Sequence, residues 1–493
     1  MNDLQTQKKN LIMFPLGTVG RDMMYQLFTN FILTYVLFTR SLTAAQLMAI
    51  TGIMVGARIF DALNDPVMGN IIERTRGKYG KFKPWLVIGI LSTCVVEYLA
   101  FNTDLQGWSF VWFFGVIYFM YSITYTMHDI SYWGMVPALG SDAHTRNQFT
   151  ARATLFAGIG GTLASVLIPM LTTGSNTIGG NTAFAYGRIA LAVCIIAPIF
   201  MCFTIFGVRE NRDYGNDVPP VSFKKIWDTI SGNDQLMWIA LIFLIQQIGN
   251  GLVIGGIGST YIYFEFGYEG GLFSLFSTVG MAATAFLMIF YPAISQRIHR
   301  KPLMGIMAVI SVVGYVLMLG AGLLMPTGTA KFWILTVGYM FSNFGQYCYY
   351  LVMMISILNT VEYNEYKRDT RDEAIIASLR PFFTKLASAL IVLIISACYL
   401  IFGVTNYTNQ ISELERQTSM GLITEAQKLA EIGGVISGVS HAQTLGLLFS
   451  MTVLPCALML ISYFMYKKHY TLDEEEYDRI CAEIAAQKAA AVK

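Results

Sequence analysis

The stretch RIFDALNDPVMGNIIERTRGKYGKFKPWLVIG, residues 58–89, connects one apolar segment to the next through a short basic turn. Arg58, Asp61 and Asp65 lie inside the first of these apolar segments. A charge at the centre of a membrane helix costs about 2.5–3.5 kcal/mol even on the most lenient scale, so such residues usually face a bundle interior or a water-filled cavity. The stretch therefore raises two questions: whether the chain crosses a membrane, and what these charges bind.

The composition predicts an integral membrane protein. Hydrophobic residues make up 55% of the chain and charged residues 13%, whereas soluble domains carry about 25% charged residues. A bilayer core about 30 Å thick is crossed by a helix of about 20 apolar residues. Windows of this length predict twelve transmembrane helices, and the apolar runs are continuous, which argues against a β-barrel. The windows are 12–39, 44–70, 85–103, 108–138, 148–172, 183–207, 236–265, 271–296, 303–325, 332–361, 374–403 and 441–466.

Polar segments divide the chain into two halves. The longest central break, residues 208–234, contains two prolines and mixed charge, with six predicted helices before it and six after it. Each half places a short basic loop between its second and third helices. The pattern resembles the major facilitator fold, all-α with two six-helix bundles. The predicted domains are an N-terminal bundle (1–207), a cytoplasmic linker (208–234), a C-terminal bundle (235–467) and a cytoplasmic tail (468–493).

The distribution of positive charge predicts the orientation. Only four Lys or Arg residues lie in the loops between the predicted helices on one side, whereas most of the 33 lie in the segments on the other side. Cytoplasmic loops carry the excess of Lys and Arg, so we expect a multi-pass protein of the cytoplasmic membrane with both termini in the cytoplasm. On that outer side, residues 404–440 form a long loop in which 411–433 is a predicted surface helix. The net charge of +2 gives no reason to expect nucleic acid as a partner.

The charges of the second predicted helix form one stripe. Arg58, Asp61 and Asp65 are spaced i, i+3 and i+7 and therefore share a helical face, which leaves the opposite face for lipid. Two carboxylates four residues apart repel each other, and a bound Na⁺ or H⁺ would relieve that repulsion. The alternative is that the charges are ion pairs within the bundle, such as Arg58 with Asp61, or Lys385 with an aspartate.

The fourth predicted helix carries a second stripe, with Thr126, Asp129 and Trp133 on one face. A carboxylate accepts hydrogen bonds from sugar hydroxyl groups, and an indole packs against the C–H face of a sugar ring. Seven cysteines are present without a CxxC pair or a histidine cluster, so neither a disulfide framework nor a metal centre is expected. A membrane enzyme would need a nucleophile or metal ligands near the aspartates, and none is apparent. A sugar sensor on a transporter scaffold would usually carry a signalling domain, which the short tail does not provide.

Three motifs resemble those of the glycoside–pentoside–hexuronide:cation symporters. They are the opening stretch at 58–89, YTMHDISYWGMVPAL at 125–139 and RPFFTKLASAL at 380–390. The resemblance extends over almost the whole chain. It implies a symporter that couples Na⁺, Li⁺ or H⁺ to the import of a glycoside by alternating access. A galactoside-like di- or oligosaccharide is the favoured substrate, and a hexuronide or pentoside is the alternative.

The same resemblance implies the site residues. The cation ligands would be Asp61, Asp65, Asp129 and Thr126; the sugar ligands Asp22, Asp129, Trp133 and Arg152; and the coupling residue Lys385. We also expect Arg58, which shares a helical face with Asp61 and Asp65, to take part in coupling. No cofactor is expected beyond the coupling cation. The expected partners are the sugar and the lipid bilayer, with the protein functional as a monomer.

Arg21, next to Asp22, is a charge that this pattern does not require. If its side chain enters the cavity, an acidic sugar such as a glucuronide becomes a possible substrate. The alternative is that Arg21 pairs with a neighbouring carboxylate or faces an inner vestibule.

Overall fold

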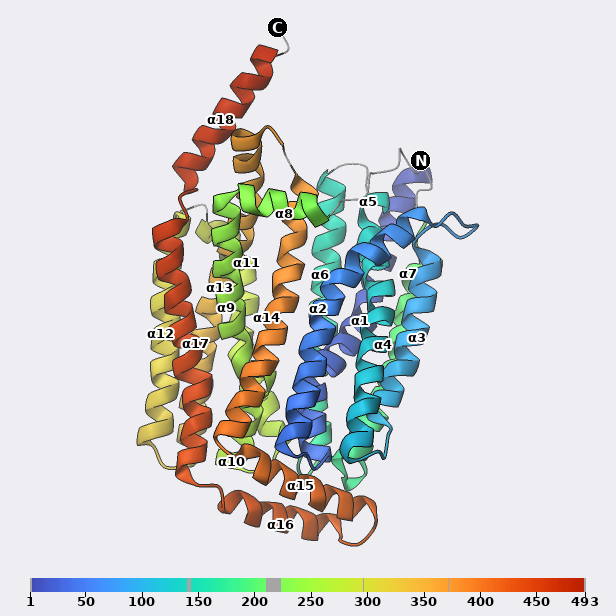
Figure 1. Ribbon diagram of the computed structural model, residues 1–493, viewed down its shortest axis with the longest axis vertical. Coiled ribbons are helices and arrows are strands. Elements are labelled where there is room, and N and C mark those ends of the chain that lie inside the picture. Colours follow the sequence, from blue (N-terminus) through green and yellow to red (C-terminus); the bar gives the residue numbers. More distant parts are fainter. Residues whose placement is uncertain (1, 140–142, 210–222, 296, 371, 492–493) are drawn as a thin grey trace. The chain divides into compact units, whose positions relative to one another are not determined.

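The computed structural model describes residues 2–139, 143–209, 223–295, 297–370 and 372–491. Every regular element in these ranges is a helix (Figure 1), which confirms the predicted all-α fold class. The twelve predicted segments lie on α1 (Asn2–Thr39), α2 (Ala44–Arg74), α3 (Lys83–Phe101), α4 (Gly107–Gly134), α6 (Ala143–Thr172), α7 (Thr182–Gly207), α9 (Asp234–Leu252) with α10 (Gly258–Phe266), α11 (Gly270–Ser295), α12 (Arg300–Leu324), α13 (Thr329–Arg368), α14 (Glu373–Ile401) and α17 (His441–His469).

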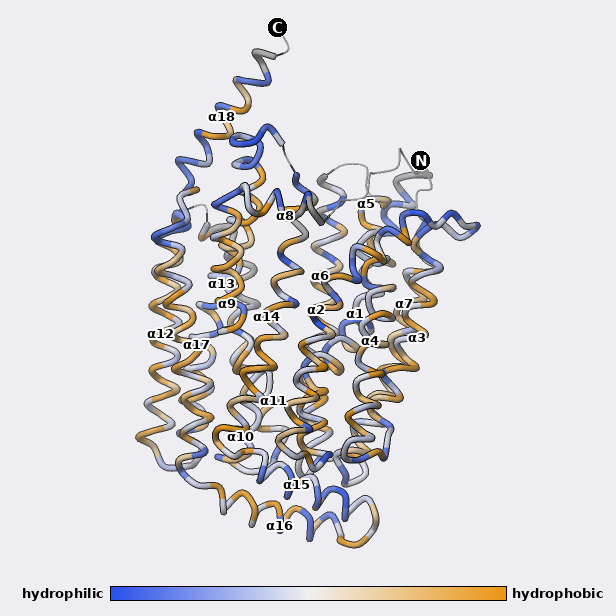
Figure 2. The backbone as a smooth tube through the Cα atoms, viewed as in Figure 1, coloured by the Kyte–Doolittle hydropathy of each residue, from blue (hydrophilic) through white to orange (hydrophobic). Residues whose placement is uncertain are grey.

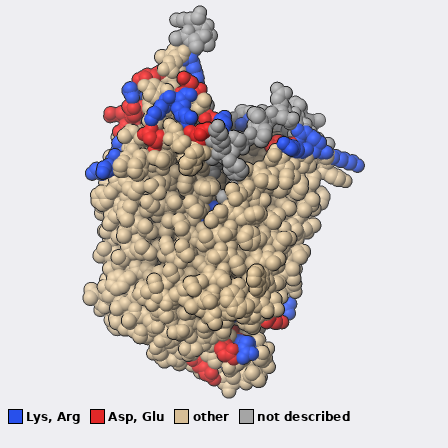
Figure 3. Space-filling view, in the orientation of Figure 1, with Lys and Arg blue, Asp and Glu red and all other residues tan. Residues whose placement is uncertain are grey.

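Nine helices of the described ranges are long and apolar enough to cross a membrane, and α11 adds a shorter apolar helix, Gly270–Thr284. Figure 2 shows hydrophobic residues along the lengths of these helices and hydrophilic residues towards their ends. The face of the molecule in Figure 3 shows the same distribution, because its charged side chains gather near the helix ends. This is the pattern that a hydrocarbon layer requires.

The chain forms two compact units. The first comprises Met1–Val218, Ser259–Leu275 and Val392–Gln443, and the second Pro219–Gly258, Phe276–Ile391 and Thr444–Lys493. The first unit therefore includes two stretches from the second half of the sequence. The predicted domain boundaries at 207, 234 and 467 stay a prediction.

In the first unit, α1 packs against α6 and α7, and α4 packs against α2 and α3. Thr43 begins α2 with a capping box: its hydroxyl accepts from the Gln46 backbone N–H at 3.2 Å, and the Gln46 side chain accepts from the Thr43 N–H at 3.0 Å. Such a pair satisfies two of the backbone donors that every helix start leaves unpaired. It fixes the position at which the helix bearing the charged stripe begins.

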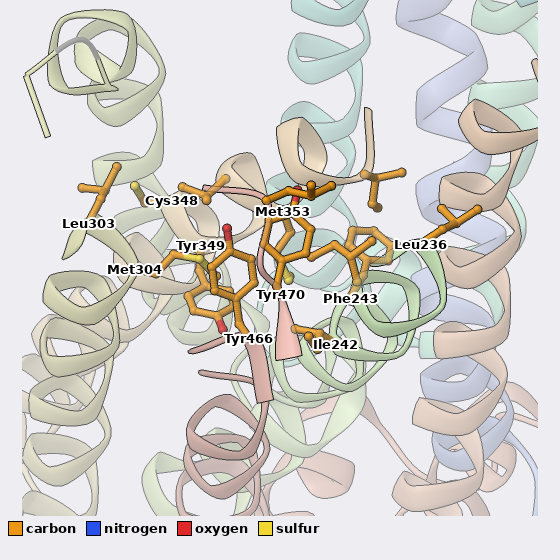
Figure 4. Close-up of a cluster of buried hydrophobic side chains, with 14 of the residues drawn as sticks. Leu236, Ile242, Phe243, Leu303, Met304, Cys348, Tyr349, Met353, Tyr466 and Tyr470 are labelled. Carbon is orange, nitrogen blue, oxygen red and sulfur yellow. The ribbon is translucent and has the colours of Figure 1, made fainter. Parts of the chain in front are cut away.

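The second unit has a core of large apolar and aromatic side chains, most of them from α9, α12, α13 and α17, with others from α11, α14, α18 (Glu474–Ala491) and the segment after α17 (Figure 4). The residues labelled there are Leu236, Ile242, Phe243, Leu303, Met304, Cys348, Tyr349, Met353, Tyr466 and Tyr470. Between α9 and α10 the helix widens into a π-helical segment, Val253–Ile257, in which Gly256 has a φ of 135°. The seventh predicted helix is thus interrupted where glycine supplies a conformation closed to other residues.

Shorter helices occupy the polar segments. They are α5 (Val136–Leu139), α8 (Phe223–Gly232), α15 (Val404–Ser419), α16 (Glu425–Ser437) and α18 (Glu474–Ala491). The single surface helix predicted over 411–433 is wrong, because this segment forms two helices, α15 and α16. Gly421 has a φ of 71°, and Thr424 caps the start of α16 through its hydroxyl, so the chain turns between them.

Candidate functional site

The charged stripe of α2 lies on the buried face of that helix. Arg58 and Asp61 are 7% and 5% exposed, whereas Ile59, Leu63 and Val67 are 51%, 52% and 54% exposed. The three apolar residues are spaced by one helical turn on the other face. The prediction that this helix turns its charges inward and its apolar face outward is confirmed.

Two contacts organise the inner face of α2. Arg58 Nη1 lies 3.6 Å from Asp61 Oδ2, and the Thr126 hydroxyl of α4 donates to Asp65 Oδ1 at 3.3 Å. Three polar atoms buried here have no hydrogen-bond partner among the residues that the structure describes: Asp61 Oδ1, Arg58 Nε and Asn64 Nδ2. The sequence analysis missed Asn64, although its i+3 spacing from Asp61 could have pointed to it. Unsatisfied buried polar atoms are costly, so this face of α2 is suited to receive a polar or charged ligand.

Arg21 of α1 contacts three of the residues that are predicted to bind sugar: Asp22, Asp129 and Trp133. Its Nη1 donates to Asp129 Oδ1 at 2.6 Å, and its Nη2 donates to Asp22 Oδ2 at 2.8 Å. The guanidinium carbon lies 5.2 Å from the centroid of the Trp133 ring and 5.2 Å from that of Tyr132. The side chain is 4% exposed. The alternative in which Arg21 pairs with a neighbouring carboxylate is confirmed, and the partners include Asp129 as well as Asp22.

One turn of α4 contacts both the charged face of α2 and the charged residues of α1. Thr126 binds Asp65 of α2, and Asp129, three residues later, binds Arg21 of α1. The Asp129 side chain remains 32% exposed, whereas those of Asp22 and Arg21 are 20% and 4% exposed. Asp129 is therefore the most accessible of the three paired groups. An accessible carboxylate beside two buried polar clusters is a chemically suitable place for a hydroxyl-bearing ligand or a cation.

Arg152, which is predicted to bind sugar, contacts the backbone of α1 in this structure. Pro15 interrupts α1, and because proline has no N–H it cannot donate to the carbonyl of Leu11 four residues earlier. Arg152 Nη1 donates to this carbonyl at 3.2 Å. Among the described residues, no hydrogen bond or ion pair connects Arg152 to Asp22, Asp129 or Trp133. Its guanidinium instead satisfies a backbone group that α1 leaves open.

The other predicted residues are placed as follows. Lys385 lies half-buried on α14 in the second unit. Within the described ranges, no three His, Cys, Asp or Glu side chains form a group that could hold a metal ion. Asp61, Asp65 and Asp129 do not form such a group in this structure. Arg58 lies beside Asp61, and Arg21 lies beside Asp129.

The fold identifies the class of protein. The chain superposes on a D-xylose–proton symporter with a TM-score of 0.60 at 10% identity, covering 89% of this chain and 99% of that one. A bacterial homologue of the human lysosomal transporter Spinster matches with a TM-score of 0.61 at 11% identity over 95% and 98% of the two chains. The protein shares the fold of these two transporters, and a match to a major facilitator family model shows that it is a multi-pass membrane protein of that superfamily.

The family follows from sequence. The model described as MFS/sugar transport protein matches residues 13–474, so the chain belongs to this family, the glycoside–pentoside–hexuronide:cation symporters. It is a sugar symporter and not an enzyme.

Three relatives illustrate the range of the family. A lactose permease from Lactobacillus helveticus is 25% identical over 97% of this chain and 72% of its own length. A raffinose carrier protein from Pediococcus pentosaceus is 26% identical over 96% and 71%. A glucuronide carrier protein homologue from Escherichia coli is 23% identical over 98% and 97%.

Proposed function

We propose that this protein imports a galactose-containing di- or oligosaccharide across the cytoplasmic membrane, driven by a Na⁺, Li⁺ or H⁺ gradient. The names of two relatives that match almost the whole of this chain, a lactose permease and a raffinose carrier, support the substrate class, because lactose and raffinose both contain a galactosyl unit. The observation that carries the proposal is the position of Thr126 and Asp129, which contact α2 and α1 from one turn of α4. That turn is where a cation and a sugar can affect each other.

The cation arm of the proposal comprises Asp61, Asp65, Asp129 and Thr126. Carboxylate and hydroxyl oxygens suit a hard cation such as Na⁺, and the free Oδ1 of Asp61 is one oxygen available for it. Arg58 and Arg21 neutralise Asp61 and Asp129. An entering cation competes with these arginines for the same oxygens, so its binding releases their guanidinium groups. We assign Arg58 to coupling on this basis, together with Lys385 from the family motif.

The sugar arm comprises Asp22, Asp129 and Trp133, with Arg152 carried over from the family. Asp22 and Asp129 accept hydrogen bonds from sugar hydroxyls, and Trp133 packs against the ring. Arg21 holds both carboxylates in place before the sugar arrives. Arg152 reaches the sugar only after leaving the Leu11 carbonyl.

A hexuronide or pentoside is the second candidate substrate. The buried guanidinium of Arg21 beside Trp133 favours it, because this group could receive a sugar carboxylate. Uptake assays with galactosides, xylosides and glucuronides distinguish these substrates. In either case we propose that both termini face the cytoplasm, as the Lys and Arg distribution indicates, and that a monomer transports.

The decisive experiment is uptake into proteoliposomes under an imposed Na⁺ gradient. We expect Asp61→Asn and Asp65→Asn to abolish accumulation against a sugar gradient while sugar exchange at equal concentrations continues, because each change removes a cation ligand and leaves the sugar arm. Asp104→Asn, an exposed carboxylate after α3, is the matched control and should accumulate sugar normally. Normal accumulation by both Asp61→Asn and Asp65→Asn would refute the cation assignment.

A further inference from the structure

Helices α15 and α16 form a hairpin, residues 404–437, that the sugar and cation chemistry does not use. It connects α14 to α17 and lies transverse to α1, α2 and α7 of its own unit in Figure 1. Although the second half of the chain encodes it, the hairpin belongs to the first compact unit, where α15 packs against α1 and α7. Both ends of the hairpin thus continue into helices that lie largely in the second unit, while its body contacts the first unit.

A buried ion pair fixes the hairpin to the beginning of α7. Glu415 and Lys428 are 2% and 1% exposed, and Lys428 Nζ lies 3.1 Å from Glu415 Oε1. The Glu415 carboxylate also accepts from the Thr182 N–H at 2.9 Å, from the Thr182 hydroxyl at 2.9 Å and from the Asn181 amide at 3.2 Å. Lys428 donates to the Gly180 carbonyl at 2.7 Å. Each charge is therefore paired and hydrogen-bonded, as a buried charge must be.

Glu415 also matches the electrostatics of the helix that it contacts. Its carboxylate accepts from a free N–H in the first turn of α7, where the backbone dipoles favour a negative charge. Asn181 contributes twice at this point, since its Oδ1 caps α7 by accepting from the Phe184 N–H at 2.9 Å and its Nδ2 donates to the Glu415 carbonyl at 2.6 Å. The start of α7 is therefore completed by the hairpin.

A second contact fixes the hairpin to the turn between α1 and α2. The Asn409 side chain accepts from the Leu42 N–H at 2.9 Å and donates to the Leu42 carbonyl at 2.8 Å. Beside it, the hydroxyls of Ser41 and Ser412 lie 2.9 Å apart. The two contacts hold α15 near both of its ends, at elements of the first half of the chain that are far apart in sequence.

We propose that this hairpin is the outer gate of the carrier: it closes the outer side by binding the start of α7 and the α1–α2 turn, and it releases both whenever that side opens. Alternating access moves one bundle relative to the other. A hairpin continuous with α14 and α17 but bonded to α1, α2 and α7 cannot follow both bundles, so its contacts break and re-form in each cycle. The fully satisfied polar contacts make this a two-state element. The proposal depends on the carrier class and not on which sugar or cation is transported.

The first test cross-links the gate. Ser41→Cys/Ser412→Cys places two thiols where the hydroxyls are 2.9 Å apart. In proteoliposomes we expect oxidation to stop sugar uptake and a reductant to restore it, while each single cysteine variant transports under both conditions. Transport by the reduced double variant shows that it folds and that the carrier function holds. Undiminished uptake by the oxidised, cross-linked protein would overturn the gate.

The second test weakens the gate and measures opening directly. Ser412 is 2% exposed, so the labelling rate of Ser412→Cys by an impermeant maleimide reports release of the hairpin. Adding Glu415→Gln removes one charge of a buried pair and should raise this rate about tenfold or more. Glu413→Gln is the matched control: it breaks the exposed Glu413–Arg416 pair two residues away and should leave the rate unchanged. Equal rates in the two variants would overturn the proposal, independently of any transport measurement.

Discussion

Glu97 of α3 is a buried carboxyl group without a hydrogen-bond partner in the described part of the chain. Its side chain is fully buried, and neither oxygen accepts a hydrogen bond. The electrostatic neighbours include Cys94 on the same helix, Tyr121 of α4 and Cys194 of α7. None of the residues assigned to the cation or the sugar contacts it. Glu97 is therefore a cost to stability that the proposed transport chemistry does not require.

Replacing Glu97 by leucine should stabilise the protein. The change keeps most of the volume and removes two buried oxygens that have no partner, which cost about 1–3 kcal/mol when unsatisfied. We expect a higher thermal unfolding midpoint in detergent and unchanged sugar uptake. Glu97→Ala is the comparison, because it also removes the oxygens but leaves a cavity and should unfold at a lower temperature than Glu97→Leu. A Glu97→Leu protein that folds and no longer transports would instead show that the carboxyl takes part in the cycle.

Single residues show where sequence reasoning about the site succeeds. Charges within apolar segments correctly indicated the inward faces of α2 and α4, because burial of a charge is costly whatever the fold. The hydrogen-bond partner of Arg152 could not be predicted from the sequence in the same way. This partner is a carbonyl freed by Pro15, 137 residues earlier, and only tertiary packing brings the two together.

At the scale of elements, helices α12 and α13 of the second unit pack closely against each other at glycines. A Cβ added to Gly314 of α12 would overlap the Ser342 backbone nitrogen and the Gly338 carbonyl of α13, whereas a Cβ on Gly320 of the same helix would meet nothing within 4 Å. Small residues let membrane helices approach closely enough for backbone contact. Gly314 therefore allows the two backbones to approach each other, whereas the position of Gly320 has room for a side chain.

Alanine substitutions should separate these roles. Gly314→Ala is expected to destabilise the protein by about 1–3 kcal/mol, because the added methyl group forces two backbones apart. Gly320→Ala should leave the stability unchanged or raise it by up to about 1 kcal/mol, since alanine favours a helix interior over glycine. Thermal unfolding in detergent measures both. If the two variants shift the midpoint in the same direction by similar amounts, the close approach at Gly314 does not limit packing.

Hydropathy predicted the long helices better than the features between them. Every predicted segment lies on a helix, because about 20 apolar residues have few other ways to satisfy their backbone in lipid. The break at Val253–Ile257 and the division of α15 from α16 were missed. Both depend on the conformation of one glycine, Gly256 or Gly421, and many of the chain's other 42 glycines lie inside regular helices.

For the whole molecule, the sequence predicted two halves but not the composition of the compact units. The central polar break marks a change of bundle in the sequence, whereas the stretches 259–275 and 392–443 join the first unit through contacts distant in sequence. Glu415 with Thr182 is one such contact, across 233 residues. A pairing of this kind has no local sequence pattern, so an isolated glutamate in an outer loop could only be interpreted as a solvated charge.

The coupling of the two proposed ligands is also a property of the whole molecule. If sugar and cation both act on Asp129 and its neighbours, each tightens the binding of the other by the same factor, about 5–150-fold for typical coupling free energies. Titration calorimetry of the sugar with and without Na⁺ measures this factor. Thr126→Ala should reduce it, because the hydroxyl is the contact from the turn carrying Asp129 to Asp65. Trp133→Ala should weaken sugar binding about tenfold and change the factor less than Thr126→Ala does, since the proposed role of the ring is to stack on the sugar.

A nearby threonine provides the control for this prediction. Thr124 lies on the same helix and is buried, but its hydroxyl donates only to the Tyr121 carbonyl of its own helix at 3.3 Å. Thr124→Ala should therefore leave the coupling factor at the wild-type value. If Thr126→Ala and Thr124→Ala have the same factor as the wild type, the cation acts on the sugar by a route that does not pass between α2 and α4. The sugar and cation sites would then have to be sought on separate elements, and Asp129 would be a ligand of one of them only.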